Sequence, residues 1–167
     1  MDVRLTRHPL GYWEISEKPG HDELKFYYAQ KYFQESRGGY EHNYDNAELE
    51  FLRAKLEQRW HLLRRITGAK LVTDTSRMLD IGCGEGFALA FFRAKGWQVK
   101  GIDFSSSGLE SKNPSCRDAL VVGDVFELLK YEIASGQKYQ VVWLQNVLEH
   151  VLDPIELLSS LRRLGKL

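Results

Sequence analysis

The segment 82–86, Gly-Cys-Gly-Glu-Gly, constrains the fold of this 167-residue chain more than any other feature, because its three alternate glycines join two different apolar patterns. Residues 77–81 have the pattern of a buried strand, and residues 88–95 have that of a helix ended by Gly96. A strand-to-helix turn that lets a ligand approach the backbone leaves no room for Cβ atoms, and glycine has none. The free N–H groups at the start of the helix favour a carboxylate or phosphate. The segment therefore predicts a ligand-binding loop at the first crossover of a parallel sheet.

An acidic residue, Asp103, ends the next apolar run, residues 97–102. In dinucleotide-binding folds a carboxylate at this place accepts hydrogen bonds from the ribose hydroxyls, so the two features together indicate a nucleoside-bearing cofactor. The glycine spacing is G-x-G-x-G and not the G-x-G-x-x-G of the dinucleotide fingerprint, and no separate catalytic domain is evident. A nicotinamide-dependent oxidoreductase is therefore disfavoured.

With Asp80 two residues before the first glycine, the pattern D-x-G-x-G-x-G resembles motif I of the class I S-adenosylmethionine-dependent methyltransferases. Residues 121–125, Val-Val-Gly-Asp-Val, are similar to the third-strand motif of that family, and residues 139–151 are similar to its fourth strand and the following loop. These matches and Asp103 occur in the family's order within residues 78–161. Four matches in one order are more specific than any one of them.

Each part of this resemblance also has a plainer interpretation. Asp103 is equally typical of a turn, Asp124 of a helix cap, and the glycines of ordinary chain reversal. Cys83 is expected to be a small buried residue, because no histidine partner is indicated for a catalytic thiol. The ordered set of matches favours the methyltransferase interpretation over these separate ones.

The resemblance implies that the cofactor is S-adenosyl-L-methionine and that its product is S-adenosyl-L-homocysteine. In the family, the acidic side chain after the third strand meets the adenine amino group and the next backbone N–H meets a ring nitrogen, which here are Asp124 and Val125. Backbone after the fourth strand holds the methionine ammonium. The expected cofactor-binding residues are Asp80, Gly82, Cys83, Gly84, Gly86, Asp103, Phe104, Asp124, Val125, Gln145, Asn146 and Tyr32; no metal is expected.

The expected activity is methyl transfer to a small molecule, with a hydroxyl oxygen as the acceptor atom. The protein then mainly aligns the acceptor with the methyl group and excludes water. His150, beside Glu149, is the candidate general base, although local packing of this histidine is an equally good interpretation. The alternative function is a non-catalytic S-adenosylmethionine-binding or interaction module, because the family often recognises its substrate through a C-terminal half that this sequence does not match.

Composition narrows the class of partner. Lys plus Arg and Asp plus Glu both number 23, so nucleic acid is not an expected partner, and 43% hydrophobic residues suffice for one core. No apolar run approaches the roughly 20 residues that span a bilayer, so no membrane partner and a cytoplasmic location are expected. Cys83 and Cys116 are too few for a disulfide framework and lack metal-ligand spacing, which fits a reducing compartment.

The alternation of apolar patterns over residues 71–167 predicts an α/β, Rossmann-like parallel sheet with helices on both faces and strand order 3-2-1-4. In the resembled family three more strands follow, so a truncated chain is expected. Its fourth strand would have an open apolar edge that forms a homodimer or is covered by the N-terminal arm. Strands are expected near 77–81, 98–102, 119–122 and 139–145, and helices near 86–95, 105–112, 125–135 and 154–164.

Residues 1–70 are expected to form an N-terminal arm and a helical cover. Little regular structure is expected in residues 1–20, followed by a tyrosine-rich helix over 21–37. A second helix, begun by a capping box at Asp45 and ended by Gly68, has an apolar stripe expected to cover one face of the sheet. Four tyrosines are candidates for a lid over the cofactor, with ordinary packing as the alternative: Tyr28, Tyr32, Tyr40 and Tyr44.

Overall fold

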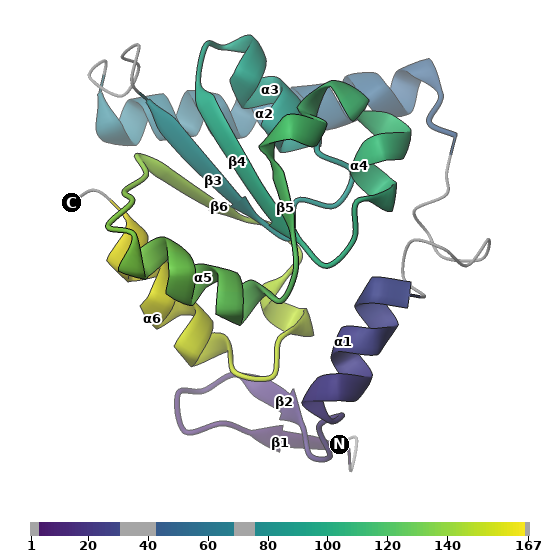
Figure 1. Cartoon of the computed structure of the whole chain (residues 1–167), viewed down its shortest axis with the longest axis vertical. Helices are drawn as coiled ribbons and strands as arrows, with labels where there is room; N and C mark the ends of the chain where they lie inside the picture. The colour runs from purple at the N-terminus through teal and green to yellow at the C-terminus, as the bar shows by residue number, and fades with distance from the viewer. Residues whose placement is uncertain (1–3, 31–42, 69–75, 166–167) are drawn as a thin grey trace.

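The computed structural model describes residues 4–30, 43–68 and 76–165, and its centre is a four-stranded parallel sheet (Figure 1). The strand order is β5-β4-β3-β6, which confirms the predicted 3-2-1-4 order when only the strands of this sheet are numbered. Parallel strands place all their carboxyl ends at one edge, so the loops after them converge there. The strands are β3 (Arg77–Ile81), β4 (Gln98–Asp103), β5 (Leu120–Val122) and β6 (Val141–Leu144).

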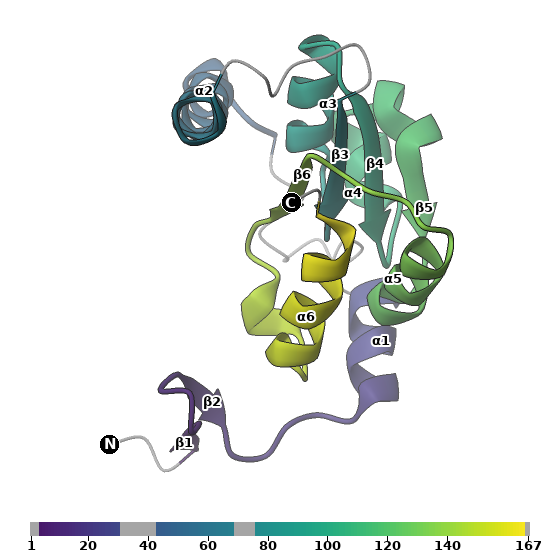
Figure 2. The same ribbon diagram turned by 90° about the vertical axis from the view of Figure 1, so that its left-hand side faces the viewer.

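Helices cover both faces of the sheet, as expected (Figure 2). α5 (Val125–Ala134) and α6 (Pro154–Leu164) pack on the face that includes Leu79 and Ile81 of β3. On the other face, which includes Met78, lie α3 (Phe87–Ala94), α4 (Ser107–Lys112) and the 3₁₀-helix η2 (Pro114–Ala119). Side chains of β3 alternate between two apolar layers, which explains its nearly continuous apolar sequence.

A β-hairpin at the N-terminus corrects the expectation of little regular structure in residues 1–20. β1 (Leu5–Arg7) pairs with β2 (Trp13–Ile15) in antiparallel register. Gly11 adopts a φ of 93° in the connecting turn, where His8 stacks on Tyr12 with ring centroids 4.3 Å apart. Prolines and glycines in residues 1–20 favoured an irregular arm, but a tight turn such as the one at Gly11 also brings its flanking residues into register.

Two helices connect this hairpin to the sheet. α1 (His21–Gln30) confirms the start of the expected helix over 21–37, whose remainder lies outside the described residues. α2 (Asn46–Thr67) begins with the predicted capping box and ends at Gly68. The Asp45 carboxylate accepts from the Glu48 N–H at 2.8 Å, and the Glu48 carboxylate accepts from the Asp45 N–H at 2.9 Å.

Only the middle of α2 is buried, so the prediction that its whole stripe covers the sheet was wrong. Leu56 and Trp60 are buried, whereas Leu49 and Ile66 near the two ends are 41% and 74% exposed. The Trp60 ring packs edge-on against Phe92 of α3 at 5.8 Å. α2 therefore rests on α3 and extends past it at both ends, because a straight 22-residue helix is longer than the element it crosses.

The segment just before β6 pairs with the end of α6 and the residue after it. The Tyr139 N–H donates to the Leu164 carbonyl at 2.9 Å, and Tyr139 forms a parallel bridge with Gly165. The predicted fourth strand is thus paired at Tyr139, whereas β6 itself is an edge strand of the sheet, and the homodimer remains a prediction. Within the described ranges, no helix has the length and apolar character to cross a bilayer.

A buried polar cluster lies at the opposite end of the sheet from the carboxyl ends of the strands. Glu132 of α5 is 3% exposed, and its carboxylate accepts from the Tyr139 hydroxyl at 2.6 Å and from the Lys100 ammonium group. Burial, followed by this hydrogen bond, raises the pKa of Tyr139, so the phenol remains a donor. The cluster joins α5, β4 and the segment before β6.

Replacing Glu132 by Ala is expected to lower the free energy of unfolding by about 2–3 kcal/mol, because it leaves a buried hydroxyl and an ammonium group without their carboxylate. Urea unfolding of the variant measures this loss. Glu127→Ala is the control, since the Glu127–Lys130 pair is exposed and its removal is expected to have no measurable effect. Equal midpoints for the two variants would contradict the prediction.

Candidate functional site

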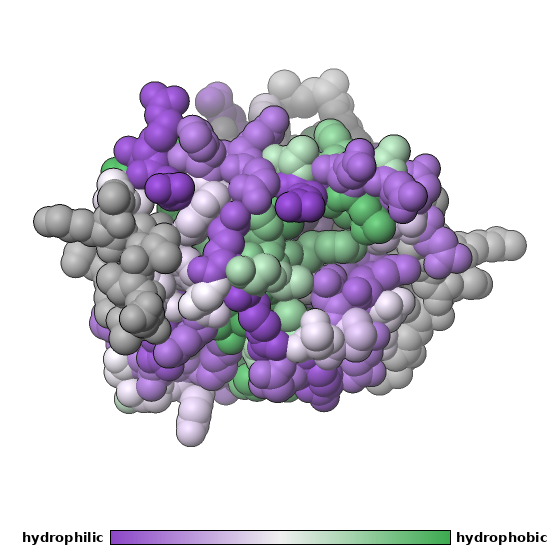
Figure 3. All heavy atoms as spheres, turned by 90° about the horizontal axis from the view of Figure 1, so that it is seen from above, coloured by the Kyte–Doolittle hydropathy of each residue, from purple (hydrophilic) through white to green (hydrophobic). Residues whose placement is uncertain are grey.

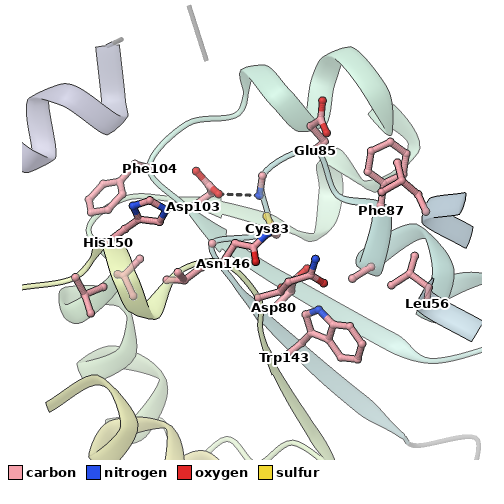
Figure 4. A pocket seen from close by; sticks show the side chains of 18 of the residues that line it. Leu56, Asp80, Cys83, Glu85, Phe87, Asp103, Phe104, Trp143, Asn146 and His150 are labelled. Atoms are coloured by element: carbon pink, nitrogen blue, oxygen red, sulfur yellow. Dashed lines mark hydrogen bonds between the residues drawn. The ribbon is translucent and has the colours of Figure 1, made fainter. Parts of the chain in front are cut away.

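A cavity of about 300 Å³ opens at the carboxyl edge of the sheet, where the loops after all four strands converge (Figure 4). The face of α2 and Leu24 of α1 complete its lining. It brings together most of the residues expected to bind the cofactor, together with the candidate base. These are Asp80, Gly82, Cys83, Gly84, Asp103, Phe104, Asp124, Val125, Gln145, Asn146 and His150.

Among the described residues, one expected cofactor-binding residue is not in this lining. Gly86 instead occupies the position before the first residue of α3, with a φ of 76° in the left-handed region. Tyr32 lies outside the described residues, as does Tyr40. Of the candidate lid tyrosines, Tyr44 lines the cavity and Tyr28 belongs to α1.

The glycine loop has the backbone geometry that its sequence predicts. Gly82 has a φ of 65° and Gly84 a φ of 53°, both in the region that side chains with a Cβ rarely adopt. A Cβ at Gly82 would lie 2.5 Å from Cγ2 of Val147, so the loop also needs glycine for space. The N–H groups of Gly82 and Cys83 both donate to the Ile102 carbonyl, at 2.8 and 3.3 Å. The loop is thereby attached to the end of β4.

Asp103 is buried and linked to the glycine loop (Figure 4). One carboxylate oxygen accepts from the Gly84 N–H at 2.8 Å, and the other accepts from the Ser105 N–H at 3.1 Å. Burial raises the pKa of this carboxyl, and the backbone N–H bonds from Gly84, Ser105 and Phe104 act in the opposite direction. Since a carboxylate has about four lone-pair sites, both oxygens retain capacity for a ligand hydroxyl.

Two further side chains, Asp80 before the loop and Cys83 within it, are also buried. Burial, and then the charge of Asp103, raises the pKa of Asp80 well above its usual value. Burial likewise raises the pKa of the Cys83 thiol, so this side chain stays protonated at neutral pH. Cys83 therefore has the properties of a small buried residue and not of a nucleophile.

Asp124 caps α5 and lines the cavity at the same time. Its Oδ1 accepts from the Phe126 N–H at 2.9 Å and from the Glu127 N–H at 3.1 Å. The plainer interpretation of this residue as a helix cap is thus correct, but it does not exclude a ligand contact because the other oxygen is not used by the cap. The adenine contact of Asp124 remains a prediction.

The loop after β6 supplies the opposite side of the cavity. Asn146 has a φ of 54°, the one positive φ among the described non-glycine residues. His150 ends the short 3₁₀-helix η3 (Leu148–His150), and its N–H donates to the Val147 carbonyl at 2.9 Å. The structure therefore places the candidate base at the cavity, beside the loop predicted to hold the cofactor.

One face of α2 lines the cavity, and the sequence analysis missed it. Lys55 and Arg59 lie on this face with Leu52 and Leu56. The Arg59 guanidinium donates to the Gln145 side-chain oxygen at 2.9 Å and lies over the Trp143 ring at 5.9 Å. No carboxylate among the described residues pairs with Arg59. Cations inside an apolar helical stripe were the available signal, because a stripe that only packs in a core has none.

A second missed contact joins the start of α2 to the glycine loop. The Tyr44 hydroxyl donates to a Glu85 carboxylate oxygen at 2.6 Å, and Glu85 is only 7% exposed. The Tyr44 ring packs edge-on against Phe87 at 5.4 Å. Both Tyr44 and Glu85 line the cavity. The described residues contain no group of three His, Cys, Asp or Glu side chains that could hold a metal ion.

A second hollow shares Leu52, Leu56 and Phe87 with the lining of the first. Seen from above, the molecule has hydrophobic side chains in the middle of the view with hydrophilic ones around them (Figure 3). The groove between α2 and α3 is lined mainly by apolar residues, including Leu49, Phe91 and Ala94. It contains none of the expected cofactor-binding residues.

Comparisons with known proteins agree on one family. A family model described as a methyltransferase domain matches residues 42–166. The chain is 33% identical over 90 residues to the ubiquinone biosynthesis O-methyltransferase of Rhodopseudomonas palustris strain TIE-1, covering 54% of this chain and 36% of that protein. It is 29% identical over 141 residues to the protein of the same name from Salmonella newport strain SL254, covering 75% and 58%. The chain spans less than two thirds of the length of both relatives.

A solved structure shows the same fold. Magnesium protoporphyrin IX methyltransferase from Synechocystis PCC 6803, solved with bound S-adenosylmethionine, superposes with a TM-score of 0.62 at 16% identity. The superposition covers 92% of this chain and 75% of that one. The sheet and its helices are therefore arranged as in that protein.

Proposed function

The chain belongs to the methyltransferase-domain family, in its class I S-adenosylmethionine-dependent form, and we propose that it transfers the cofactor's methyl group to a hydroxyl of a small molecule. The observation that carries the proposal is the direct hydrogen bond between the glycine loop and Asp103 at one cavity. A ligand with a polar end beside a pair of hydroxyls would suit both the loop and this carboxylate. The cofactor's methionine and ribose supply these groups.

The residues of the cavity suit the parts of this cofactor. Asp103 accepts hydrogen bonds from the ribose hydroxyls, and Asp124 with the N–H of Val125 contacts the adenine edge. The glycine loop and the backbone at Gln145 and Asn146 hold the amino-acid end. When bound, the cofactor supplies an electrophilic methyl group on a sulfonium. The mostly apolar walls exclude water from that group.

Arg59 is proposed to bind the methionine carboxylate of the cofactor. Its guanidinium is held over Trp143 by the hydrogen bond to Gln145, at the strand end expected to hold the amino-acid part. Among the described residues it has no carboxylate partner, so a ligand carboxylate would complete its ionic pairing. A guanidinium and a carboxylate form a strong, charge-assisted pair where water is excluded.

The acceptor atom is proposed to be a hydroxyl oxygen, with His150 as the base that removes its proton. The names of both curated relatives include O-methyltransferase, which supports oxygen as the acceptor. A neutral imidazole near pH 7 has the right basicity to take the proton from a phenol or alcohol as its oxygen attacks. The apolar lining, which includes Leu52, Phe87 and Leu152, favours an acceptor with an apolar or aromatic body.

Isothermal titration with S-adenosyl-L-homocysteine tests the proposal. The wild-type protein is expected to bind this product and not NAD. Arg59→Met keeps the apolar stem of the side chain and removes the charge, so the affinity is expected to fall about 10-fold. Arg65→Met is the matched control, because Arg65 is an exposed residue of the last turn of α2.

A radiolabelled methyl-transfer assay with a panel of phenols and aliphatic alcohols then separates an enzyme from a cofactor-binding module. Methyl transfer that is lost in His150→Gln, with unchanged binding of S-adenosyl-L-homocysteine, supports the proposed base. Binding without any transfer supports the module. Absence of binding by the wild-type protein would refute the proposed function.

A further inference from the structure

The contact between Tyr44 and Glu85 has no role in the chemistry proposed above, yet it links the N-terminal cover to the loop that holds the cofactor. We propose that Tyr44 is a positioning residue: by donating its hydroxyl to Glu85 it holds α2 over the cavity, which keeps Arg59 in place and slows release of the methylation product. This inference rests on the proposed function, and it attributes slow dissociation of the product to the contact between Tyr44 and Glu85.

The geometry of the contact indicates a strong interaction. The oxygen-to-oxygen distance is 2.6 Å, in the range of hydrogen bonds from a hydroxyl to an ionised carboxylate. Glu85 is 7% exposed, and its backbone carbonyl accepts from the Asn113 side chain at 2.7 Å, which fixes the loop on its other side. The Lys112 ammonium group lies 5.5 Å from the centre of the Tyr44 ring. Tyr44 therefore contacts the loop, α3 and the end of α4 together.

Because Tyr44 lies directly before the start of α2, its contact with Glu85 also holds the first turn of the helix. Tyr44 directly precedes Asp45, whose capping box fixes the first turn of the helix. A further attachment of α2 is Trp60, which packs against Phe92 about 21 Å along the helix from Asn46 at 1.5 Å per residue. The part of the helix that lines the cavity, Leu52 to Arg59, lies between these two points. Without the Tyr44 contact, the N-terminal turns of α2 would lose their hydrogen bond to the glycine loop, and this part of the helix would be held by Leu56, Glu57, Arg59 and Trp60 alone.

A second property makes Tyr44 a determinant of release and not only of stability. Glu85 lies within the glycine loop, next to Gly84, which donates to Asp103. The hydrogen bond from Tyr44 to Glu85 thus holds α2 and also restrains the glycine loop at the amino-acid end of the cofactor. Opening of α2 would expose this end of the ligand first, so the dissociation rate should respond more than the association rate.

Tyr44→Phe tests the inference, with Tyr131→Phe as the matched control because Tyr131 is 72% exposed and does not line the cavity. In the ligand-free proteins, amide hydrogen exchange in the first two turns of α2 is expected to be about 10-fold faster in Tyr44→Phe, and unchanged in the control. Stopped-flow dissociation of S-adenosyl-L-homocysteine is expected to be about 10-fold faster in Tyr44→Phe, with association changed less than 2-fold.

Combining Tyr44→Phe with Arg59→Met distinguishes positioning from simple destabilisation. If Tyr44 acts through Arg59, its effect on dissociation shrinks in the Arg59→Met background, whereas a general loss of stability would add to it. Glu85→Gln is the second route to the same contact if Tyr44→Phe does not fold, and should speed the exchange of α2 as well.

The outcomes are separable from those of the proposed function. Unchanged exchange of α2 in Tyr44→Phe overturns the inference whether or not the cofactor product binds. Faster exchange with unchanged dissociation also overturns it. If the wild-type protein does not bind S-adenosyl-L-homocysteine, the proposed function fails, and the inference about product release fails with it, while the exchange data still report the attachment of α2.

Discussion

Asp103→Asn is expected to lower the affinity for S-adenosyl-L-homocysteine about 100-fold, the largest loss expected from a change of one polar group. A carboxylate accepts hydrogen bonds at both oxygens, whereas an amide presents an NH2 donor on one side. That donor would face either the Gly84 N–H or the Ser105 N–H, because the two oxygens of Asp103 accept from these groups at 2.8 and 3.1 Å. Losing a charge-assisted hydrogen bond and leaving a donor unpaired together account for about 2–3 kcal/mol. Isothermal titration measures the difference.

Two controls isolate the ribose contact. Asp118→Asn removes an exposed carboxylate that pairs with Arg93 and lies outside the cavity, so the affinity should stay at the wild-type value. An analogue of S-adenosyl-L-homocysteine without the 2′ and 3′ hydroxyls should bind weakly and with a much smaller difference between wild type and Asp103→Asn. If the variant loses as much affinity for this analogue as for the natural product, Asp103 acts on the loop and not on the ribose.

The raised pKa of Asp103 gives this interaction a pH dependence. The ionised carboxyl is the form that accepts both hydroxyls, so affinity should increase as the pH rises through the pKa of the folded protein. Stability of the ligand-free protein responds in the opposite sense. Because the folded-state pKa lies above the unfolded one, the contribution of Asp103 to stability is complete below the unfolded pKa and is lost as pH rises through the folded one. The pKa of Asp80 is also raised, so its contribution has the same sign.

The sequence identified those parts of the site that depend on local chain geometry. Three glycines between an apolar strand and a helix need a turn with positive φ, and Gly82 and Gly84 have it. Because β3 and β4 pair in parallel, Asp103 at the end of β4 lies at the same edge of the sheet as the glycine loop after β3. The capping box at Asp45 was predictable for the same reason, since both of its partners lie within one turn.

Contacts between distant segments could not be predicted in this way. The Tyr44 hydroxyl meets Glu85 across 41 positions of sequence, and Arg59 meets Gln145 across 86. Hydrophobic periodicity showed that α2 has an apolar face, but it did not show how much of that face is covered. The ends of the stripe, Leu49 and Ile66, are exposed because burial depends on the length of the neighbouring α3. Only the assembled structure shows that Lys55 and Arg59 face a cavity.

The prediction with the largest expected effect on stability is Gly82→Ala, which combines two separable costs. The residue has a φ of 65°, and its new Cβ would lie 2.5 Å from Cγ2 of Val147. The left-handed backbone costs about 1 kcal/mol for alanine, and forcing the side chain of Val147 aside adds about 1–3 kcal/mol. Binding of S-adenosyl-L-homocysteine should be lost, because movement of Val147 displaces the loop after β6 from the glycine loop. Urea unfolding and titration measure the two effects.

Gly136→Ala supplies the matched control for the backbone term alone. Gly136 has a φ of 70°, and nothing lies within 4 Å of a Cβ built there. Its loss of stability should therefore equal the conformational cost, and the excess in Gly82→Ala measures the steric one. In a Val147→Ala background, Gly82→Ala should cost no more than the backbone term, because the remaining Cβ at position 147 would be 3.6 Å away, an ordinary contact distance; Val147→Ala alone is the reference, since Val147 packs against the core. Equal losses of stability in Gly82→Ala and Gly136→Ala would show that the glycine loop does not contact Val147 in the loop after β6. That result would contradict the close approach of the two loops at this side of the cavity.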